Sequence, residues 1–364
     1  MKQFQVKRDD FHQHRIVDDE AAATTELADG EIRVRINRFA FTANNITYAV
    51  AGDMIGYWQF FPALGDDAEG WGVIPVWGFA EVLDCKAEGL SVGEKLFGYF
   101  PPADELTMLP TRISEHGFID GAVHRSQLPA GYNRYRRVQA EVGYSASGDD
   151  ERMLLWPLYA TAFCLGDSLL DNDWYDAEQV LIISASSKTS IGLAYALRSI
   201  DGAPRSVGIT SSRNLDFVSS IGVYDDLCCY DDVSALDLTK PSVIVDMSGN
   251  TAVLAELHSA LGDNMKFTVN VGLTHWEDAE PNEKINTERS EFFFAPGHIQ
   301  KRSEEWGPQE FDRRSSEFVA SAADQSRSWL SLSQRGGLAG LSDIYDDVCE
   351  GRNSPKEGIV IDMS

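Results

Sequence analysis

The second half of the chain alternates short apolar runs with amphipathic stretches. The runs are too short for buried helices and rich in Val, Ile and Leu, which is typical of buried strands. The predicted strands cover residues 180–183, 206–210, 227–230, 242–246 and 266–273. Between them, apolar residues recur at helical spacing over 191–198, 214–221 and 251–261. Strands that alternate with helices predict an α/β fold with a doubly wound parallel sheet.

The first half shows a different pattern. Residues 31–36 alternate apolar and polar positions, and 38–41 extend them, which predicts a half-buried strand. Short strands with glycine turns at 75–84 and 89–99 are typical of a small β-barrel. The polar patch at 42–52 opens a short helix that Asn44 or Asn45 can cap.

The remaining segments are assigned more coarsely. Residues 1–30 are interpreted as an edge strand and an acidic loop, and 151–170 as a helix with one apolar face. We expect a long polar and aromatic connection over 276–310, a helix over 311–332 and a closing strand at 359–361.

The stretch that follows the first parallel strand is the most informative motif. Small and hydroxylated residues lie between Ile183 and the next predicted helix. A strand, a tight loop and a helix in this order form the phosphate-binding corner of nucleotide-binding folds, because the backbone N–H groups and the dipole of the helix N-terminus attract phosphate. With Gly192 as the third glycine of a dinucleotide fingerprint, Ser187 and Thr189 hold the first two positions. The alternative is an ordinary βα turn. A Walker A loop is excluded, since one required glycine would be Ile182 inside the strand.

Composition and charge narrow the class of protein. The chain has 364 residues and a net charge of −26, which argues against nucleic acid or anionic membranes as partners. No apolar run reaches the roughly 18 residues of a membrane span, and no secretory signal is recognised, so we expect a cytoplasmic protein. Only ten of the 31 basic residues are lysine, which suggests a salt-tolerant source. The five cysteines form no CxxC pair and the histidines no HExxH motif, so no metal site is predicted.

Four short motifs, in this order along the chain, resemble the medium-chain dehydrogenase/reductase superfamily. Residues 89–98 resemble its V-x-x-G-D-x-V-x-G strand pair, and 155–162 its L-x-x-x-x-x-T-A helix. Residues 245–249 are similar to its V-x-D-x-x-G strand end, and 344–352 to its C-terminal ending. The chain is closest in style to the zinc-free quinone and enoyl reductases, in a divergent bacterial family without an established function.

The resemblance implies a domain layout. It places a GroES-like catalytic domain at 1–150, a Rossmann nucleotide-binding domain at 151–300 and a return to the first domain at 301–364. The catalytic-zinc pattern of the superfamily is absent, because residues 76–80 replace its Gly-His-Glu and no cysteine stands in 42–48. Zinc alcohol-dehydrogenase chemistry therefore has no ligands here. Family members often form homodimers through the nucleotide-domain sheet, which this sequence neither supports nor excludes.

The second parallel strand indicates which nucleotide binds. An NAD site places an acidic residue roughly 20 residues beyond the glycine loop. Here the strand is followed by Ser211, Ser212 and Arg213, with no acidic residue. Because hydroxyls and a guanidinium suit a 2′-phosphate, we predict NADPH. The alternative is that Arg213 only begins a surface helix.

Further contacts to NADPH are expected at the ends of the parallel strands. The predicted cofactor-binding residues are Ser187, Lys188, Thr189, Ser190, Ser211, Ser212, Arg213, Ser248, Gly249 and Gly272.

The predicted catalytic residues are Tyr48 and Asn45. Tyr48 is the first choice for an oxyanion or proton donor, since a phenol with a lowered pKa can act near neutral pH. The alternatives are that Asn45 only caps the helix and that Tyr48 only packs in the barrel. Several aromatic residues follow Tyr48 in the sequence, namely Trp58, Phe60, Phe61, Trp71 and Trp77. If they line a cleft, they predict an apolar small-molecule substrate.

Two functions follow from these observations. The first is a zinc-free NADPH-dependent reductase that transfers a hydride to an activated C=C or C=O of an enone, quinone or enoyl thioester. The second is a catalytically inactive NADPH-binding sensor or scaffold with the same fold. The missing glycines and the lack of a clear acid–base residue keep the second open.

Overall fold

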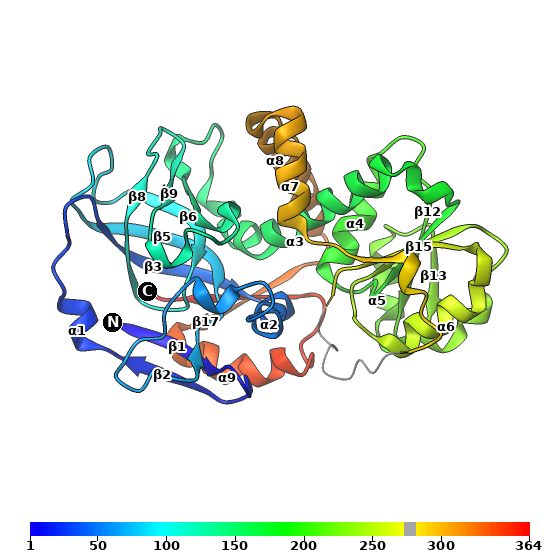
Figure 1. The fold of residues 1–364 in the computed structure, drawn as a ribbon, viewed down its shortest axis with the longest axis horizontal. Helices are drawn as coiled ribbons and strands as arrows, with labels where there is room; N and C mark the ends of the chain where they lie inside the picture. Colours follow the sequence, from blue (N-terminus) through cyan, green and yellow to red (C-terminus); the bar gives the residue numbers. More distant parts are fainter. Residues whose placement is uncertain (273–281) are drawn as a thin grey trace. The chain divides into compact units, whose positions relative to one another are not determined.

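The computed structural model describes residues 1–272 and 282–364, which form two compact units. The first unit contains Met1–Leu154 and Leu330–Ser364, and the second contains Leu155–Trp329 (Figure 1). The first segment of the expected layout agrees with this division to within a few residues. The boundary expected at residue 301 is wrong, because it falls inside a helix of the second unit.

The first unit contains a nine-stranded sheet in the order β17-β18-β3-β5-β6-β10-β9-β8, with β7 paired to β3. Its pairs are antiparallel except for β17 with β18. The strands are β3 (Ile32–Phe41), β5 (Val76–Cys85), β6 (Lys95–Phe100), β7 (Glu105–Met108), β8 (Pro110–Thr111), β9 (Gly117–Asp120), β10 (Arg134–Arg137), β17 (Ser331–Gly336) and β18 (Glu357–Asp362).

A smaller sheet and three helices complete the first unit. The sheet contains β1 (Lys2–Lys7), β2 (His14–Asp18) and β4 (Trp71–Gly72) in the order β2-β1-β4. The helices are α1 (Glu20–Thr24), α2 (Ala43–Val50) and α9 (Gly337–Cys349). The acidic loop expected within residues 1–30 is therefore wrong in part, because β2 pairs with β1 and α1 follows it.

The second unit is built on a six-stranded sheet in the order β13-β12-β11-β14-β15-β16, with parallel pairs throughout. The strands are β11 (Gln179–Ile183), β12 (Arg205–Thr210), β13 (Asp226–Cys229), β14 (Ser242–Asp246), β15 (Met265–Asn270) and β16 (Ser290–Phe292). The helices are α3 (Asp149–Asp171), which begins in the first unit, α4 (Lys188–Arg198), α5 (Leu215–Ile221), α6 (Thr251–Leu261), α7 (Ala295–Trp306) and α8 (Pro308–Ser326). Counted along the chain, this order is the 3-2-1-4-5-6 order of Rossmann folds.

Alternate residues of β11 face opposite layers of the second unit. Leu181 and Ile183 belong to an apolar cluster with α6, whereas Val180 and Ile182 belong to a cluster with α3 and α4. Side chains of a strand point alternately to its two faces, so a strand covered on both faces is apolar at every position. This explains the continuous apolar run at 180–183.

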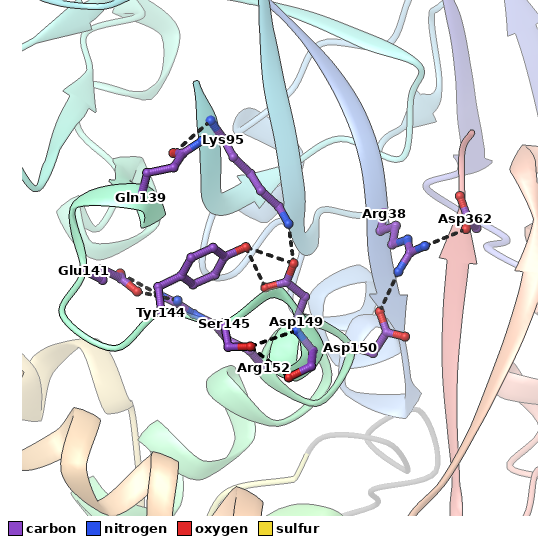
Figure 2. A network of polar contacts seen from close by, with 11 residues as sticks. Arg38, Lys95, Gln139, Glu141, Tyr144, Ser145, Asp149, Asp150, Arg152 and Asp362 are labelled. Carbon is purple, nitrogen blue, oxygen red and sulfur yellow. Dashed lines mark hydrogen bonds and ion pairs between the residues drawn. The ribbon is translucent and has the colours of Figure 1, made fainter. Parts of the chain in front are cut away.

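A polar network fixes the start of α3 within the first unit (Figure 2). The Asp149 carboxylate accepts hydrogen bonds from Lys95 Nζ and, at 3.1 Å, from Tyr144 Oη. The next residue, Asp150, is paired with Arg38, which also contacts Asp362 on β18. The Asp149 side chain is only 6% exposed, so its partners compensate for the loss of water.

Residues 146–171, which include α3, form a stretch long and apolar enough to cross a membrane by length and composition alone. Over half of its most apolar window is buried inside the fold. A mostly buried core helix has the same length and composition. Helix α3 packs on the parallel sheet through Ala162, Leu165 and Leu169, as a core helix does.

The long connection expected over 276–310 is wrong for its described part, which contains β16 and α7. Helix α7 is tied to α3 by charge, since His298 Nε2 and Arg302 Nε each lie 2.6 Å from Asp167 Oδ2. These contacts explain why the second unit continues beyond residue 301. The end of the strand expected at 266–273 falls partly outside the described residues, which exclude 273–281.

Candidate functional site

The turn after β11 is built from serine rather than glycine. Ser184 has φ +63°, a left-handed conformation that non-glycine residues seldom adopt. Its carbonyl oxygen accepts a hydrogen bond from Ser187 N at 2.8 Å, which closes the turn. Ser184 therefore supplies the left-handed residue of the turn after β11. Helix α4 begins at Lys188 rather than at residue 191. The expected register, with Ser187 and Thr189 in the first two glycine positions, remains a prediction.

Ser187 is the N-cap of α4. Its Oγ accepts a hydrogen bond from Ser190 N at 3.2 Å and donates one to Ser190 Oγ at 2.8 Å. Ser190 is fully buried, and its Oγ donates to the carbonyl oxygen of Ile183. Both side chains thus shape the corner itself. Lys188 and Thr189 lie half-buried in the first turn of α4, where the helix dipole favours an anion.

The loop after β12 lies next to this turn. Asn214 Nδ2 donates a hydrogen bond to Ser186 Oγ at 3.0 Å, which ties the two loops together. Ser212 and Arg213 are exposed, and Ser211 is half-buried. Arg213 has no ion pair with any residue in 1–272 or 282–364.

The ends of β14 and β15 form the other side of the site. Asp246 Oδ1 accepts hydrogen bonds from Ser248 N at 2.7 Å and Gly249 N at 3.2 Å, and Gly249 has φ +67°. Gly272 N donates to the carbonyl oxygen of Asp246 at 3.1 Å. A Cβ at Gly272 would lie 2.1 Å from the carbonyl oxygen of Met247, so only glycine fits. The structure therefore brings Ser248, Gly249 and Gly272 together.

Sequence reasoning missed two residues of this edge, Ser184 and Tyr230. Burial and the nearby charge of Asp246 raise the pKa of Tyr230, burial being the larger effect. Hydrogen bonds with Ser184 lower this pKa in part. Tyr230 follows β13 directly, so its place after a parallel strand is a signal that the sequence contains. For Ser184 the signal is its place directly after β11.

In the first unit, α2 carries the predicted catalytic residues. Its N-cap is Thr42 rather than Asn44 or Asn45. Asn45 Oδ1 accepts from Thr42 N at 2.8 Å, and Asn45 Nδ2 donates to the carbonyl oxygen of Pro75 at 2.9 Å. Asn45 is 4% exposed, and both ends of its amide are used. Asn45 therefore has a structural role in capping α2, and its catalytic role remains a prediction.

Tyr48 belongs to a group of six aromatic residues, which we call the aromatic box. Ring centroids of Tyr48 lie 4.6 Å from Tyr57 and 5.6 Å from Tyr99. The hydroxyls of Tyr57 and Tyr132 lie 2.9 Å apart. The members come from α2, β5, β6, the short turns at 57–59 and 130–133, and the residue after the first of these turns. They are Tyr48, Tyr57, Phe60, Trp77, Tyr99 and Tyr132.

Burial raises the pKa of Tyr48 well above its usual range, and Tyr132 raises it further, against smaller opposing effects of Trp77 and Asn44. The expected lowered pKa is wrong, because the phenol is removed from water. Tyr48 thus stays neutral and can only donate or accept a hydrogen bond. Of the other aromatic residues singled out, Trp58 fills the core against Gly52 and Gly72, while Arg15 stacks on Trp71.

No group of three or more His, Cys, Asp or Glu side chains within the described residues is arranged to hold a metal ion. Zinc independence remains a prediction.

Solved structures confirm the fold. CurA from Vibrio vulnificus in complex with NADPH is 12% identical with a TM-score of 0.65, over 100% of this chain and 99% of that one. The yhdH oxidoreductase from Salmonella enterica in complex with NADP is 12% identical with a TM-score of 0.56, over the whole of both chains. An enoyl thioester reductase from Candida tropicalis, in a mutant form, is 11% identical with a TM-score of 0.59, over 100% of both chains. The expected combination of a GroES-like domain and a Rossmann domain is therefore confirmed.

Comparison of the sequence with curated proteins finds no match. The profile of one family, described as "Protein of unknown function (DUF2855)", matches residues 39–354. Since this covers most of the chain, the protein belongs to the DUF2855 family, with the two-domain fold of the medium-chain dehydrogenases/reductases.

Proposed function

We propose that this protein is an NADPH-dependent reductase that transfers a hydride to an activated C=C or C=O of an apolar small molecule. The observation that carries the proposal is the edge of the second unit, where the ends of β11, β12, β14 and β15 gather the predicted cofactor residues. Nucleotides bind at this edge of doubly wound sheets. Two proteins of the same fold, CurA and yhdH, are described with NADPH and NADP.

Arg213 is the basis for choosing NADPH over NADH. Arg213 is exposed and follows Ser211 and Ser212 directly in the chain, and no acidic residue follows β12 before Asp216. A guanidinium offers a planar fork of donors to a phosphate dianion. The 2′-phosphate of NADPH would give Arg213 the partner that it lacks among the described residues.

NADPH, when bound, supplies a hydride. The residue for which we propose a role towards the substrate is Tyr48, whose neutral hydroxyl can donate a hydrogen bond to the oxygen of the developing enolate. If a hydride were delivered to one carbon of the activated double bond, the electron pair of that bond would move to this oxygen, and a proton from solvent would complete the reduction. Tyr48 stabilises the oxygen without losing its own proton.

The first experiment is a titration of the purified protein with NADPH and with NADH, followed by nicotinamide fluorescence and by melting temperature. We expect the R213A variant to lose about tenfold or more in NADPH affinity while its weak NADH affinity is unchanged. Arg205 is the control, because it lies at the other end of β12 in an exposed pair with Asp226. R205A is expected to bind NADPH like the natural protein. Equal NADPH affinity in both variants contradicts the assignment of Arg213.

The alternative function is an NADPH-binding protein without catalysis. The observation that favours it is that the pKa of each tyrosine in the aromatic box is raised, so the box offers no group that titrates near neutrality. NADPH oxidation with a panel of enones and quinones separates the two functions. Binding without turnover of any compound supports the alternative, and turnover excludes it. Metal analysis of the active protein tests its zinc independence.

A further inference from the structure

Two buried hydrogen-bond donors belong to the aromatic box. Tyr99 Oη is buried and forms no hydrogen bond with the described residues. Trp77 Nε1 is also buried and has no partner in hydrogen-bond geometry among them, although it lies close enough to the Tyr48 hydroxyl to lower the pKa of that phenol. The Tyr99 side chain is fully buried, whereas Trp77 and Tyr132 are half-buried. Buried polar atoms in proteins are nearly always paired, because an unpaired one has lost water without compensation. A partner from outside the chain is therefore expected at Tyr99.

Other rings of the box lie close to the ring of Tyr99. The Tyr99 ring lies 4.7 Å from that of Tyr132 and 5.3 Å from those of Phe60 and Trp77, measured between centroids. Burial and the nearby hydroxyls of Tyr48, Tyr57 and Tyr132 raise the pKa of Tyr99 well above its usual value. Each of these tyrosines therefore remains a neutral phenol.

The box has the chemistry of a site for an uncharged ligand. Its walls are π-faces, against which planar rings pack in offset or edge-to-face geometry. Tyr57 and Tyr132 share one hydrogen bond, in which one hydroxyl donates and the other accepts. Tyr99 Oη and Trp77 Nε1 are the buried donors of the box without a partner in hydrogen-bond geometry among the described residues. All six side chains are neutral, so a carboxylate or phosphate would be buried without a counter-charge. A carbonyl oxygen needs only the neutral donors that are present.

We propose that the aromatic box binds an uncharged aromatic carbonyl compound, whose carbonyl oxygen accepts hydrogen bonds from Tyr99 Oη and Trp77 Nε1. The inference rests on the proposed function, because it names the class of substrate that the reductase would take. It adds two residues that the sequence did not indicate as donors. Since the ligand binds to the first unit, its binding is measurable without NADPH.

Three probes test the class of ligand by calorimetry without nucleotide. Benzylideneacetone has an aromatic ring and an uncharged ketone, cyclohexenone has the enone without the ring, and cinnamate has the ring with a carboxylate. We expect benzylideneacetone to bind at least about tenfold more tightly than either of the other compounds. Only this compound has both an aromatic ring that packs on the aromatic side chains and an uncharged oxygen that accepts from the donors of the box. Equal or tighter binding of cinnamate overturns the inference.

The Y99F variant tests the orphaned hydroxyl. It is expected to bind benzylideneacetone about tenfold more weakly, because one hydrogen bond is lost. Its melting temperature without ligand is expected to be unchanged or higher, because the variant removes a buried group that has no partner. The W77F variant keeps an aromatic ring without the N–H, and we expect a similar loss of affinity.

Tyr345 provides the matched control, because it is also fully buried but its Oη donates to the carbonyl oxygen of Phe11 at 2.8 Å. Y345F is expected to melt at a lower temperature and to bind benzylideneacetone normally. If Y99F binds as tightly as the natural protein, the partner of Tyr99 is water only and the inference is wrong.

The same data separate this inference from the proposed function. Binding that depends on Tyr99, without any NADPH oxidation, supports the inference and contradicts the reductase. Reduction of other carbonyl compounds without binding of benzylideneacetone supports the reductase and overturns the inference.

Discussion

At the residue scale, His258 makes two hydrogen bonds that define its protonation state. Its Nδ1 accepts from Asn286 N at 3.0 Å, and its Nε2 lies 2.9 Å from Thr268 Oγ1. The backbone N–H of Asn286 can only donate, so the ring is neutral with its proton on Nε2. A second proton would place two N–H groups against each other. Burial also lowers the pKa of His258 below its usual 6.5.

We predict that this residue makes the protein less stable in mild acid. Below about pH 6.5 the unfolded chain binds a proton at this residue that the folded chain excludes, so the unfolding free energy falls as pH falls. The slope approaches about 1.4 kcal/mol per pH unit until the pKa of the folded state is reached. Urea unfolding between pH 7 and 5 measures it.

The control for this prediction is H258N, which keeps an acceptor near the position of Nδ1 but does not titrate in this range. We expect H258N to have a lower unfolding free energy at pH 7 than the natural protein. We also expect its unfolding free energy to fall less between pH 7 and 5. Carboxylate titration affects both proteins equally, so the difference isolates His258. Parallel curves for the two proteins rule out this role of His258.

At the element scale, the contact between α3 and α4 depends on Gly192. A Cβ there would lie 2.6 Å from Tyr159 Cδ1 and 3.0 Å from Ala162 Cβ. Helix propensity alone predicts that the G192A substitution raises the unfolding free energy by about 1 kcal/mol. We predict a net loss of about 1–2 kcal/mol, because crowding in a packed core costs more than the propensity returns. The midpoint of urea unfolding decides the sign.

Gly297 in α7 is the matched control, because the nearest atom to its Cβ would be Phe294 Cδ1 at 4.0 Å. G297A is expected to be neutral or stabilised by up to about 1 kcal/mol. A higher unfolding free energy in both variants would mean that α3 can move away from α4 with little loss of stability.

At the scale of the whole molecule, the charge of −26 dominates the electrostatics. Several ion pairs are exposed, such as Arg313 with Glu317, and exposed pairs contribute little to stability. The excess of carboxylates repels itself in the compact state, and salt screens this repulsion. We therefore predict that the melting temperature rises when NaCl is increased from about 0.05 to 0.5 M.

Equal shifts in NaCl and KCl identify screening as the cause, and sucrose provides the control without ions. A melting temperature that falls with salt would mean that the surface ion pairs outweigh the net repulsion. Loss of activity at seawater strength would contradict the salt-tolerant source suggested by the scarcity of lysine.

The sequence by itself determined the parts of the fold that depend on local periodicity. The run at 180–183 predicted β11, and the neighbouring strands and helices of the parallel sheet followed within a few residues. These segments were predictable because a strand covered on both faces is apolar throughout and a helix repeats every 3.6 residues. The serine-rich corner was also recognised as the turn between β11 and α4.

Only the tertiary structure decided features that join distant residues. Strand β18 pairs with β3 across about 320 residues of chain, which no local pattern reveals, and β17 joins the sheet through β18. The left-handed turn at Ser184 follows from where β11 ends and α4 begins. The aromatic box assembles Tyr48, Tyr99 and Tyr132 from separate elements, and burial there raises the pKa of Tyr48 instead of lowering it. Burial and hydrogen-bond partners belong to the folded chain, so the protonation states and open donors of the site are set by tertiary contacts.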